Sequence, residues 1–233
     1  MTLRIRLPFL PAALALALAA GGAAGCGSDA PEAGAASPDE GQTPPEEEQA
    51  FDLSELGFDR GSEEAPIQII EFSDYGCVHC QAFHRDTYPA LHDEFVEEGK
   101  VVWKYIPISI AGFPNADRAA QAGVCAGEQD RFFDLSSLVY REAEAWTEAS
   151  DPVPVFTEVA EEAGLDLEAF EACMADDASL ARVHENSQLA TEIGVRGTPT
   201  FVVNGMPVQG APSLEAFRDA LNQMVEEIEA ATG

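Results

Sequence analysis

Basic residues are scarce in this chain: 12 Lys and Arg stand against 42 Asp and Glu over 233 residues, a formal net charge of -30. Because a surface this acidic repels phosphate groups, the composition excludes nucleic-acid binding, and with only two lysines it also excludes a polybasic membrane patch. Long apolar runs are missing too, since no segment reaches the roughly 20 residues of a membrane-spanning helix. Hydrophobic residues still make up 46%, enough for the core of one large domain or of one domain with an insertion.

The first 25 residues are predicted to be a secretion signal. Arg4 and Arg6 precede an apolar stretch over residues 7–20, and small residues lead up to Cys26. This arrangement resembles the signal of bacterial lipoproteins, in which the cysteine becomes the lipidated first residue, although Ala replaces Leu three places before it. We therefore expect a lipid on Cys26; ordinary cleavage that leaves a free thiol is the alternative.

Residues 26–60 are predicted to form a disordered acidic tether. Between residues 27 and 50 the chain consists mainly of Ala, Gly, Pro, Ser and acids, with no base and no large apolar side chain. Such a segment cannot bury enough surface to offset the entropy lost on ordering. A tether behind a lipid-bearing cysteine would let a membrane-held domain reach its partners.

The pattern after the tether predicts an α/β domain. Residues 67–72 and 101–106 read as strands, and residues 78–99 between them read as a helix that Pro89 should break. Near the C-terminus, residues 200–208 read as a hairpin turned by Asn-Gly, followed by an amphipathic helix capped by Ser213.

The middle of the chain, residues 114–194, is predicted to be helical, with Asn115 and Asp166 as helix caps. The simplest architecture is a βαβ unit over residues 61–113, this helical insertion, and a ββα unit over residues 195–233 that completes the same sheet.

The spacing of two cysteines indicates redox chemistry. Cys77 and Cys80 form a C-x-x-C directly after a strand and at the start of a helix, where free backbone N–H groups stabilise a thiolate. The second cysteine can then resolve a mixed disulfide, and His79 between them can favour the ionised form. Half of a structural zinc site and an inert disulfide are the alternatives; the chain offers no second close cysteine pair for zinc, and the strand-to-helix position argues against an inert bridge.

Two motifs together resemble the DsbA-like thiol:disulfide oxidoreductases of the thioredoxin superfamily. They are the segment over residues 70–80, which contains the C-x-x-C, and the segment Gly-Val-Arg-Gly-Thr-Pro-Thr-Phe over residues 194–201. With the helices between them, the resemblance covers residues 61–230. It implies a thioredoxin-like fold with an inserted helical domain, as the pattern alone suggests.

The resemblance assigns roles to the C-x-x-C. It implies that Cys77 is the attacking, more exposed thiol and that Cys80 is the buried, resolving one. His79 matches the histidine of the family's Cys-Pro-His-Cys form, whereas Val78 departs from its proline. That departure leaves open whether the protein oxidises its substrates or reduces and isomerises them.

The resemblance also implies three further site residues. Pro199 matches a cis-proline that faces the cysteine pair, and Thr198 before it would expose its backbone to an extended substrate peptide. Glu71, six residues before Cys77, matches a buried acid that assists proton movement at the resolving thiol.

The remaining two cysteines, Cys125 and Cys173, lie in predicted helices of the insertion. Some DsbA-like relatives carry a second, structural disulfide there, so the resemblance implies a Cys125–Cys173 bridge; two buried free thiols are the alternative.

The expected protein is therefore an exported, membrane-anchored oxidoreductase facing the periplasm or the extracellular side. It would pass its disulfide to reduced or unfolded exported proteins and be reoxidised by a membrane quinone-linked partner, with no cofactor and no resident metal. Two rivals remain: a reductase or isomerase kept reduced, and a module that delivers copper through Cys77, Cys80 and His84.

Overall fold

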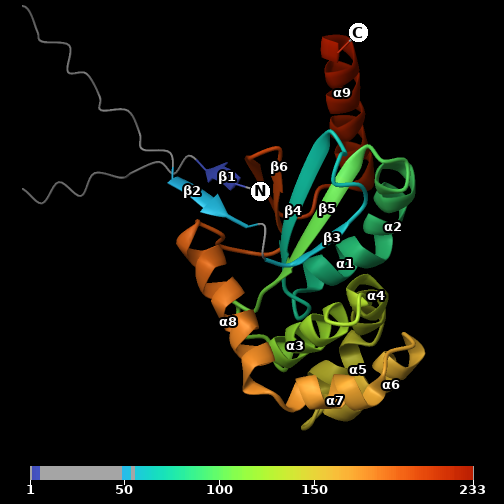
Figure 1. Ribbon diagram of the computed structural model, residues 1–233, viewed down its shortest axis with the longest axis vertical. Coiled ribbons are helices and arrows are strands. Elements are labelled where there is room, and N and C mark those ends of the chain that lie inside the picture. Colours follow the sequence, from blue (N-terminus) through green and yellow to red (C-terminus); the bar gives the residue numbers. More distant parts are fainter. Residues whose placement is uncertain (1, 6–48, 54–55, 233) are drawn as a thin grey trace, which may run out of the picture.

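The computed structural model describes residues 2–5, 49–53 and 56–232. Most of the expected signal and tether, including the lipidation candidate Cys26, lies outside these residues, so those assignments stay predictions. Strand β1 (Thr2–Ile5) pairs antiparallel with β2 (Gln49–Asp52) in a small sheet of its own (Figure 1). No helix among the described residues is long and apolar enough to cross a membrane.

The main sheet has the strand order β3-β5-β4-β6-β7, with β4 at its centre. Strands β4 and β5 run parallel, and every other neighbouring pair is antiparallel. The predicted strands and hairpin are confirmed, and the turn residues Asn204 and Gly205 have the positive φ values of 46° and 85° that this tight turn requires. The strands are β3 (Phe58–Arg60), β4 (Ile67–Ser73), β5 (Val101–Pro107), β6 (Thr200–Val203) and β7 (Met206–Gln209).

The folded part begins earlier than the expected boundary at residue 61. Strand β3 forms one edge of the main sheet, and Leu53 before it is fully buried. The ring of Phe58 in this strand stacks on that of Phe132, with 4.2 Å between centroids. The strand therefore contributes an apolar contact to the folded domain. The predicted tether over residues 26–60 is therefore too long at its C-terminal end, because Leu53 and residues 58–60 belong to the folded part.

The predicted helix over residues 78–99 is interrupted, as Pro89 suggested. It divides into α1 (Val78–Asp86), α2 (Tyr88–Leu91) and a π-helical turn η1 (His92–Val96). The break falls at Thr87, the residue before α2, and Pro89 occupies the first turn of α2, where its missing N–H costs nothing.

Both faces of the sheet are covered. One face, with Ile69 and Trp103, packs on α1, α2 and the long C-terminal helix α9 (Leu214–Thr232), which projects from the body (Figure 1). The other face, with Ile70 and Phe72, is covered by the end of α8 (Asp177–Glu192) and the segment after it.

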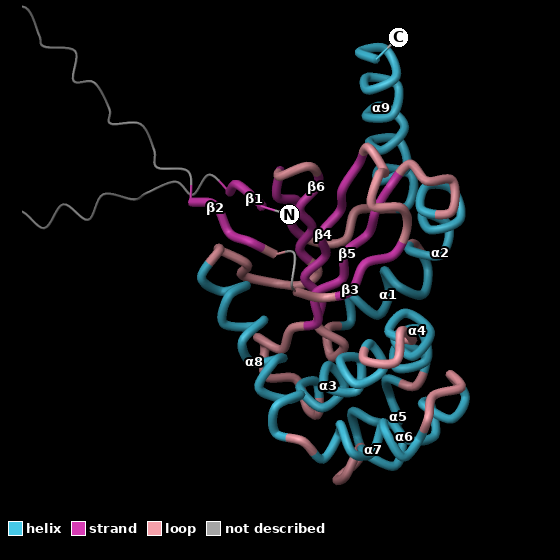
Figure 2. The backbone as a smooth tube through the Cα atoms, viewed as in Figure 1, coloured by secondary structure: helices cyan, strands magenta, loops and turns pink. Residues whose placement is uncertain are grey.

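The helical insertion is confirmed as a set of helices beyond one end of the sheet, which Figure 2 shows as a cyan group separate from the magenta strands. Asp166 caps its helix by accepting a hydrogen bond from the Ala169 N–H, as predicted. Asn115 does not cap: it lies at φ 58°, and its side chain instead donates to the carbonyls of Trp146 and Ala149. The helices are α3 (Ala116–Gly127), α4 (Phe132–Arg141), α5 (Ala143–Glu148), α6 (Val153–Glu162), α7 (Leu167–Ala175) and α8 (Asp177–Glu192).

Candidate functional site

Cys77 occupies the N-cap position of α1, at the end of the turn that follows β4. Its backbone N–H donates to the Asp74 carbonyl over 3.0 Å, which closes the turn. Gly76 is required there, because a Cβ at this position would lie 2.4 Å from the Cβ of Phe113. The local sequence thus places one sulfur at the positive end of a helix.

The surroundings of Cys77 favour its thiolate and lower the pKa of Cys77 to about 5. The largest cause is the hydrogen bond with the Cys80 side chain, and a hydrogen bond with the Thr198 side chain adds to it. The Cys77 side chain accepts no capping hydrogen bond from the first turn of α1. The nearby backbone N–H groups of His79 and Cys80 nevertheless lower the pKa of Cys77 further. The contribution of His79 comes from its backbone, and its side chain is exposed, so a role for the imidazole stays a prediction.

Cys80 has the opposite environment. Its side chain is 0% exposed, against 6% for Cys77, and both cysteines carry thiols in this structure. Burial raises the pKa of Cys80 well above its ordinary value, the neighbouring Cys77 raises it further, and a hydrogen bond with the Ser73 side chain opposes the rise. The environment of the pair therefore favours the thiolate of Cys77 and the protonated thiol of Cys80.

The second predicted motif meets the first at Cys77. The thiol of Cys77 lies 3.2 Å from the carbonyl oxygen of Thr198, and the Thr198–Pro199 peptide bond is cis. The structure thus brings together two segments about 120 residues apart, the distance at which the sequence placed them.

Glu71 lies on β4, buried at 0% exposure, with both carboxylate oxygens engaged. One oxygen lies 2.7 Å from Nε2 of His84, and the other accepts a hydrogen bond of 2.9 Å from the Trp103 indole. His84, considered as a copper ligand with the cysteines, contacts this acid instead. Among the residues the structure describes, no group of three or more His, Cys, Asp or Glu side chains is arranged to hold a metal ion.

The periodicities of β4 and α1 explain this arrangement. Glu71 and Ser73 are two apart on a strand and share a face, whereas Cys80 and His84 are four apart on a helix and share a face. The spacings match, at about 6.6 Å on the strand and about 6 Å along the helix. The helix therefore contacts the strand in two adjacent rungs, Cys80 with Ser73 and His84 with Glu71.

Buried hydroxyl groups continue from the Cys80 rung into the insertion. Ser73 Oγ lies 3.2 Å from the hydroxyl of Tyr140 on α4, which lies 2.5 Å from the hydroxyl of Tyr105 on β5. Nearby, the Tyr75 hydroxyl lies 2.6 Å from Ser136 Oγ. These tyrosines could not be predicted as site residues, because nothing in a single sequence places α4 against β4 and β5.

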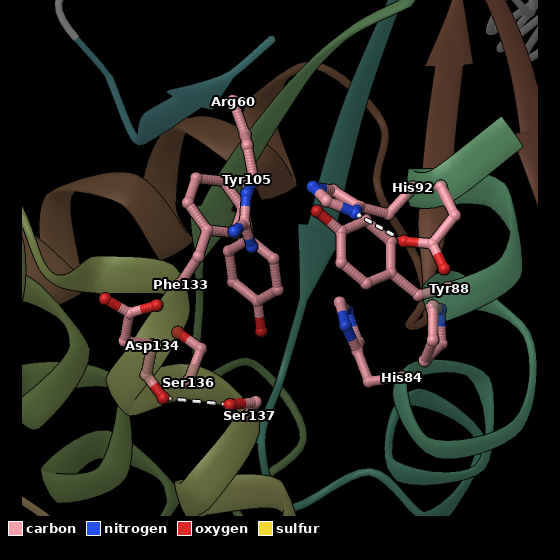
Figure 3. Close-up of a pocket in the computed structure, with 11 residues that line it drawn as sticks. Arg60, His84, Tyr88, His92, Tyr105, Phe133, Asp134, Ser136 and Ser137 are labelled. Carbon is pink, nitrogen blue, oxygen red and sulfur yellow. Dashed lines mark hydrogen bonds and ion pairs between the residues drawn. The ribbon is translucent and has the colours of Figure 1, made fainter. Parts of the chain in front are cut away.

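A cavity of about 320 Å³ adjoins this cluster (Figure 3). His84, Tyr88 and Tyr105 line it, and in Figure 3 their side chains point into the same space. Its rim includes the exposed residues Asp134 and Ser137, so the cavity opens to the surface.

Asp74 is a further acid at the site that the sequence analysis did not single out. It is 0% exposed, and its Oδ1 accepts a hydrogen bond from the Gly76 N–H over 2.9 Å, whereas Oδ2 has no hydrogen-bond partner. Burial raises the pKa of Asp74 to about 6. A signal for it was present, since an acid within the turn directly before a C-x-x-C lies close to the sulfur.

Away from the site, Cys125 and Cys173 form a disulfide that joins α3 to α7, the pairing that the sequence analysis expected.

Comparison with protein families finds one match over most of the folded chain: residues 55–223 match the thioredoxin family model described as "Thioredoxin". Among curated proteins, the Na(+)/H(+) antiporter NhaA 3 of Salinispora tropica is 30% identical over 164 residues, which cover 70% of this chain and 24% of that protein. The chain thus spans about a quarter of the length of such relatives. The probable disulfide bond formation protein D of Bacillus anthracis is 25% identical, with 70% of this chain and 76% of that protein covered.

Two solved structures share the fold. The crystal structure of Wolbachia pipientis α-DsbA1 superposes with a TM-score of 0.67 at 21% identity, covering 77% of this chain and 98% of that one. Oxidised BdbD from Bacillus subtilis superposes with a TM-score of 0.63 at 18% identity, covering 75% and 95%. The α/β fold with its helical insertion is therefore the DsbA form of the thioredoxin fold.

Proposed function

Because the chain belongs to the thioredoxin family and has the DsbA fold, we propose that it is a thiol:disulfide oxidoreductase that donates its Cys77–Cys80 disulfide to cysteines of exported proteins. The observation that carries the proposal is the contrast between the two sulfurs. Cys77 is prepared to be a thiolate, the nucleophile and leaving group of disulfide exchange, while Cys80 is buried.

The same contrast favours the oxidant direction. Contacts that lower the pKa of Cys77 to about 5 stabilise the reduced protein, and stabilising the reduced form makes the disulfide a stronger oxidant. The relative named as a probable disulfide bond formation protein agrees with this direction.

Within this function, each site residue has a proposed role. Cys77 is attacked by the client thiolate, Cys80 leaves and later resolves, and His79 tunes the pair from the exposed end of α1. Thr198 and Pro199 dock the client as an extended peptide beside Cys77, supported by the 3.2 Å contact between Cys77 and the Thr198 carbonyl. Glu71, held by His84 and Trp103, assists proton movement near Cys80.

We propose that the protein works outside the cytoplasm, held by a lipid on Cys26, and is reoxidised by a membrane quinone-linked partner. The expected signal over residues 1–25 supports export, and the Cys125–Cys173 disulfide supports an oxidising compartment. Radiolabelled palmitate incorporation in bacteria expressing the chain, with Cys26→Ala as control, tests the anchor; equal labelling of both proteins would contradict it.

The proposal is tested with the purified full chain and a reduced, unfolded client protein. We expect the oxidised protein to form client disulfides and Cys77→Ser to lose this activity completely. The reduction potential of the Cys77–Cys80 couple decides direction: a couple more oxidising than glutathione supports the oxidant, and one more reducing supports the reductase or isomerase rival. Tight Cu(I) uptake without client oxidation would support the copper rival, against which stands the engagement of His84 by Glu71.

A further inference from the structure

Cys80 is the buried member of the pair, and its chemistry poses a problem of proton supply. When a client thiolate attacks Cys77, a bond forms between those two sulfurs and the Cys77–Cys80 bond breaks. The electron pair of the broken bond goes to Cys80, which has no exposed surface and whose buried anion is unfavourable. Cys80 must therefore take up a proton that the client face does not deliver to it.

The balance of the whole exchange requires one such proton in each turnover. A second client thiolate attacks the client sulfur of the mixed disulfide, and Cys77 leaves as a thiolate. The client dithiol loses two electrons and two protons; the protein takes both electrons and, at Cys80, one proton, while the other proton goes to solvent. When the protein is reoxidised, the Cys80 proton must leave again.

Resting on the proposed function, we infer that three buried hydroxyl groups in a row carry this proton between Cys80 and the open cavity. They belong to Ser73, Tyr140 and Tyr105.

Contacts between neighbouring hydroxyl groups join the three residues. Ser73 Oγ lies 3.2 Å from the Tyr140 hydroxyl, and the two tyrosine hydroxyls lie 2.5 Å apart. At the inner end of the series, the Ser73 side chain acts on the Cys80 thiol and opposes the rise of its pKa. Tyr105 in turn lines the cavity of about 320 Å³. A hydroxyl group can donate one hydrogen bond while it accepts another, so a proton taken up at one end of such a series is passed on at the other.

The route reaches solvent away from the client. Neither Cys77 nor Thr198 lines the cavity, whose walls come from β3, α1, α2, η1, β5 and α4. A docked peptide would cover the Cys77 side without closing this opening. Proton traffic to Cys80 would thus continue while the mixed disulfide is in place.

The helical insertion completes the route. Tyr140 is contributed by α4, and its ring stacks on the His84 ring with 4.5 Å between centroids and 12° between planes. His84 is itself fixed by Glu71, so the residues of the second rung hold the middle hydroxyl in place. The insertion therefore contributes Tyr140 to the proton route of a cysteine pair that belongs to the thioredoxin-like part.

The chain offers a matched control for the test. Tyr88 is buried like Tyr140, and it lines the cavity as Tyr105 does, but its hydroxyl does not belong to the series. Tyr140→Phe and Tyr88→Phe remove the same atom from buried rings, one within the route and one outside it.

The experiment measures how fast dithiothreitol reduces the oxidised full-length protein at neutral pH, followed by stopped-flow fluorescence. Positioned proton donors contribute about 100-fold or more to such steps; because other groups near Cys80 can substitute in part, we expect Tyr140→Phe to slow reduction by at least about tenfold. Tyr88→Phe should stay within about twofold of the wild type. Alkylation of reduced Cys77 should change little in both variants, since Tyr140 does not contact that sulfur among the contacts described.

A rate for Tyr140→Phe within about twofold of that for Tyr88→Phe overturns the inference. If Tyr140→Phe fails to fold, Tyr105→Phe removes the next hydroxyl and is subject to the same comparison. A loss of Cys77 alkylation equal to the loss of the reduction rate would indicate general damage to the site and would also count against the route. Failure of the proposed function looks different, because the wild-type protein would then form no client disulfides at all.

Discussion

The thiol of Cys77 donates a hydrogen bond to the carbonyl oxygen of Thr198 over 3.2 Å, although 121 residues separate them in the chain. The side chain of Thr198 also helps to lower the pKa of Cys77. One residue therefore lies against the reactive sulfur with both its backbone and its side chain, at the place where a client peptide is proposed to dock.

Replacing Thr198 by valine removes the hydroxyl and keeps the carbonyl. We expect the pKa of Cys77 to rise above its value of about 5 because one stabilising contact to the thiolate is lost. The rate of iodoacetamide alkylation against pH measures this pKa directly. Thr157→Val, in α6 of the insertion, is the matched control and should leave the profile unchanged; an unchanged profile in Thr198→Val would remove the side chain from the explanation.

The stability of the reduced protein should depend on pH through Cys77. The native thiol ionises at about 5, whereas the unfolded thiol ionises near its ordinary pKa of about 8.5, so the unfolded state binds more protons between these values. The contribution is complete above the unfolded pKa and is lost as the pH falls toward 5, with a slope of up to about 1.4 kcal/mol per pH unit.

Urea unfolding of the reduced protein between about pH 5.5 and 8 checks this sign, with reduced Cys77→Ser as the reference. The free energy of unfolding of the wild type minus that of the variant should increase with pH. Asp74, whose pKa burial raises to about 6, titrates in both proteins and largely cancels in the subtraction. A difference that is flat across this range would mean that Cys77 is not held as a thiolate.

The Cys125–Cys173 disulfide should support the fold without taking part in the exchange. It closes a loop of 48 residues, for which the chain-entropy model gives about 4 kcal/mol of stabilisation. Replacing both cysteines by alanine should lower the free energy of unfolding by roughly this amount and leave the Cys77–Cys80 reduction potential unchanged. A shifted potential in a variant that remains folded would show that this bridge is coupled to the active site.

Local rules were enough to predict the strands, the hairpin and the placement of Cys77. The short β-rich run over residues 67–72, the Asn-Gly turn and a C-x-x-C at a strand-to-helix junction each depend on neighbours in the chain. The meeting of Cys77 with Thr198 was accessible only through the resemblance to a known family, because no local rule joins segments about 120 residues apart.

What could not be predicted depends on how the insertion packs. Tyr140 reads in the sequence as one residue of an amphipathic helix, and its contact with Ser73 exists only because α4 lies against α1 and β5. Asn115 failed as a cap for a similar reason: its side chain finds two carbonyls in a neighbouring part of the insertion, which outweighs its local preference.

The N-terminal edge of the domain provides the last prediction, since it concerns where the tether ends. Phe58, the first residue of β3, stacks on Phe132 and lies over Gly127, where an added Cβ would come within 1.9 Å of its ring. Phe58→Ala should lower the free energy of unfolding by about 2 kcal/mol, as expected for the lost burial of one aromatic side chain. Lys100→Ala, a change remote from this contact, serves as the reference.

Chains starting at residue 53 and at residue 61 extend the test in the same urea titration. The first keeps β3 and should unfold like the full chain, while the second lacks an edge strand of the main sheet and should be clearly less stable. Equal stability of the two truncated chains would restore the boundary at residue 61 and make β3 a dispensable part of the tether.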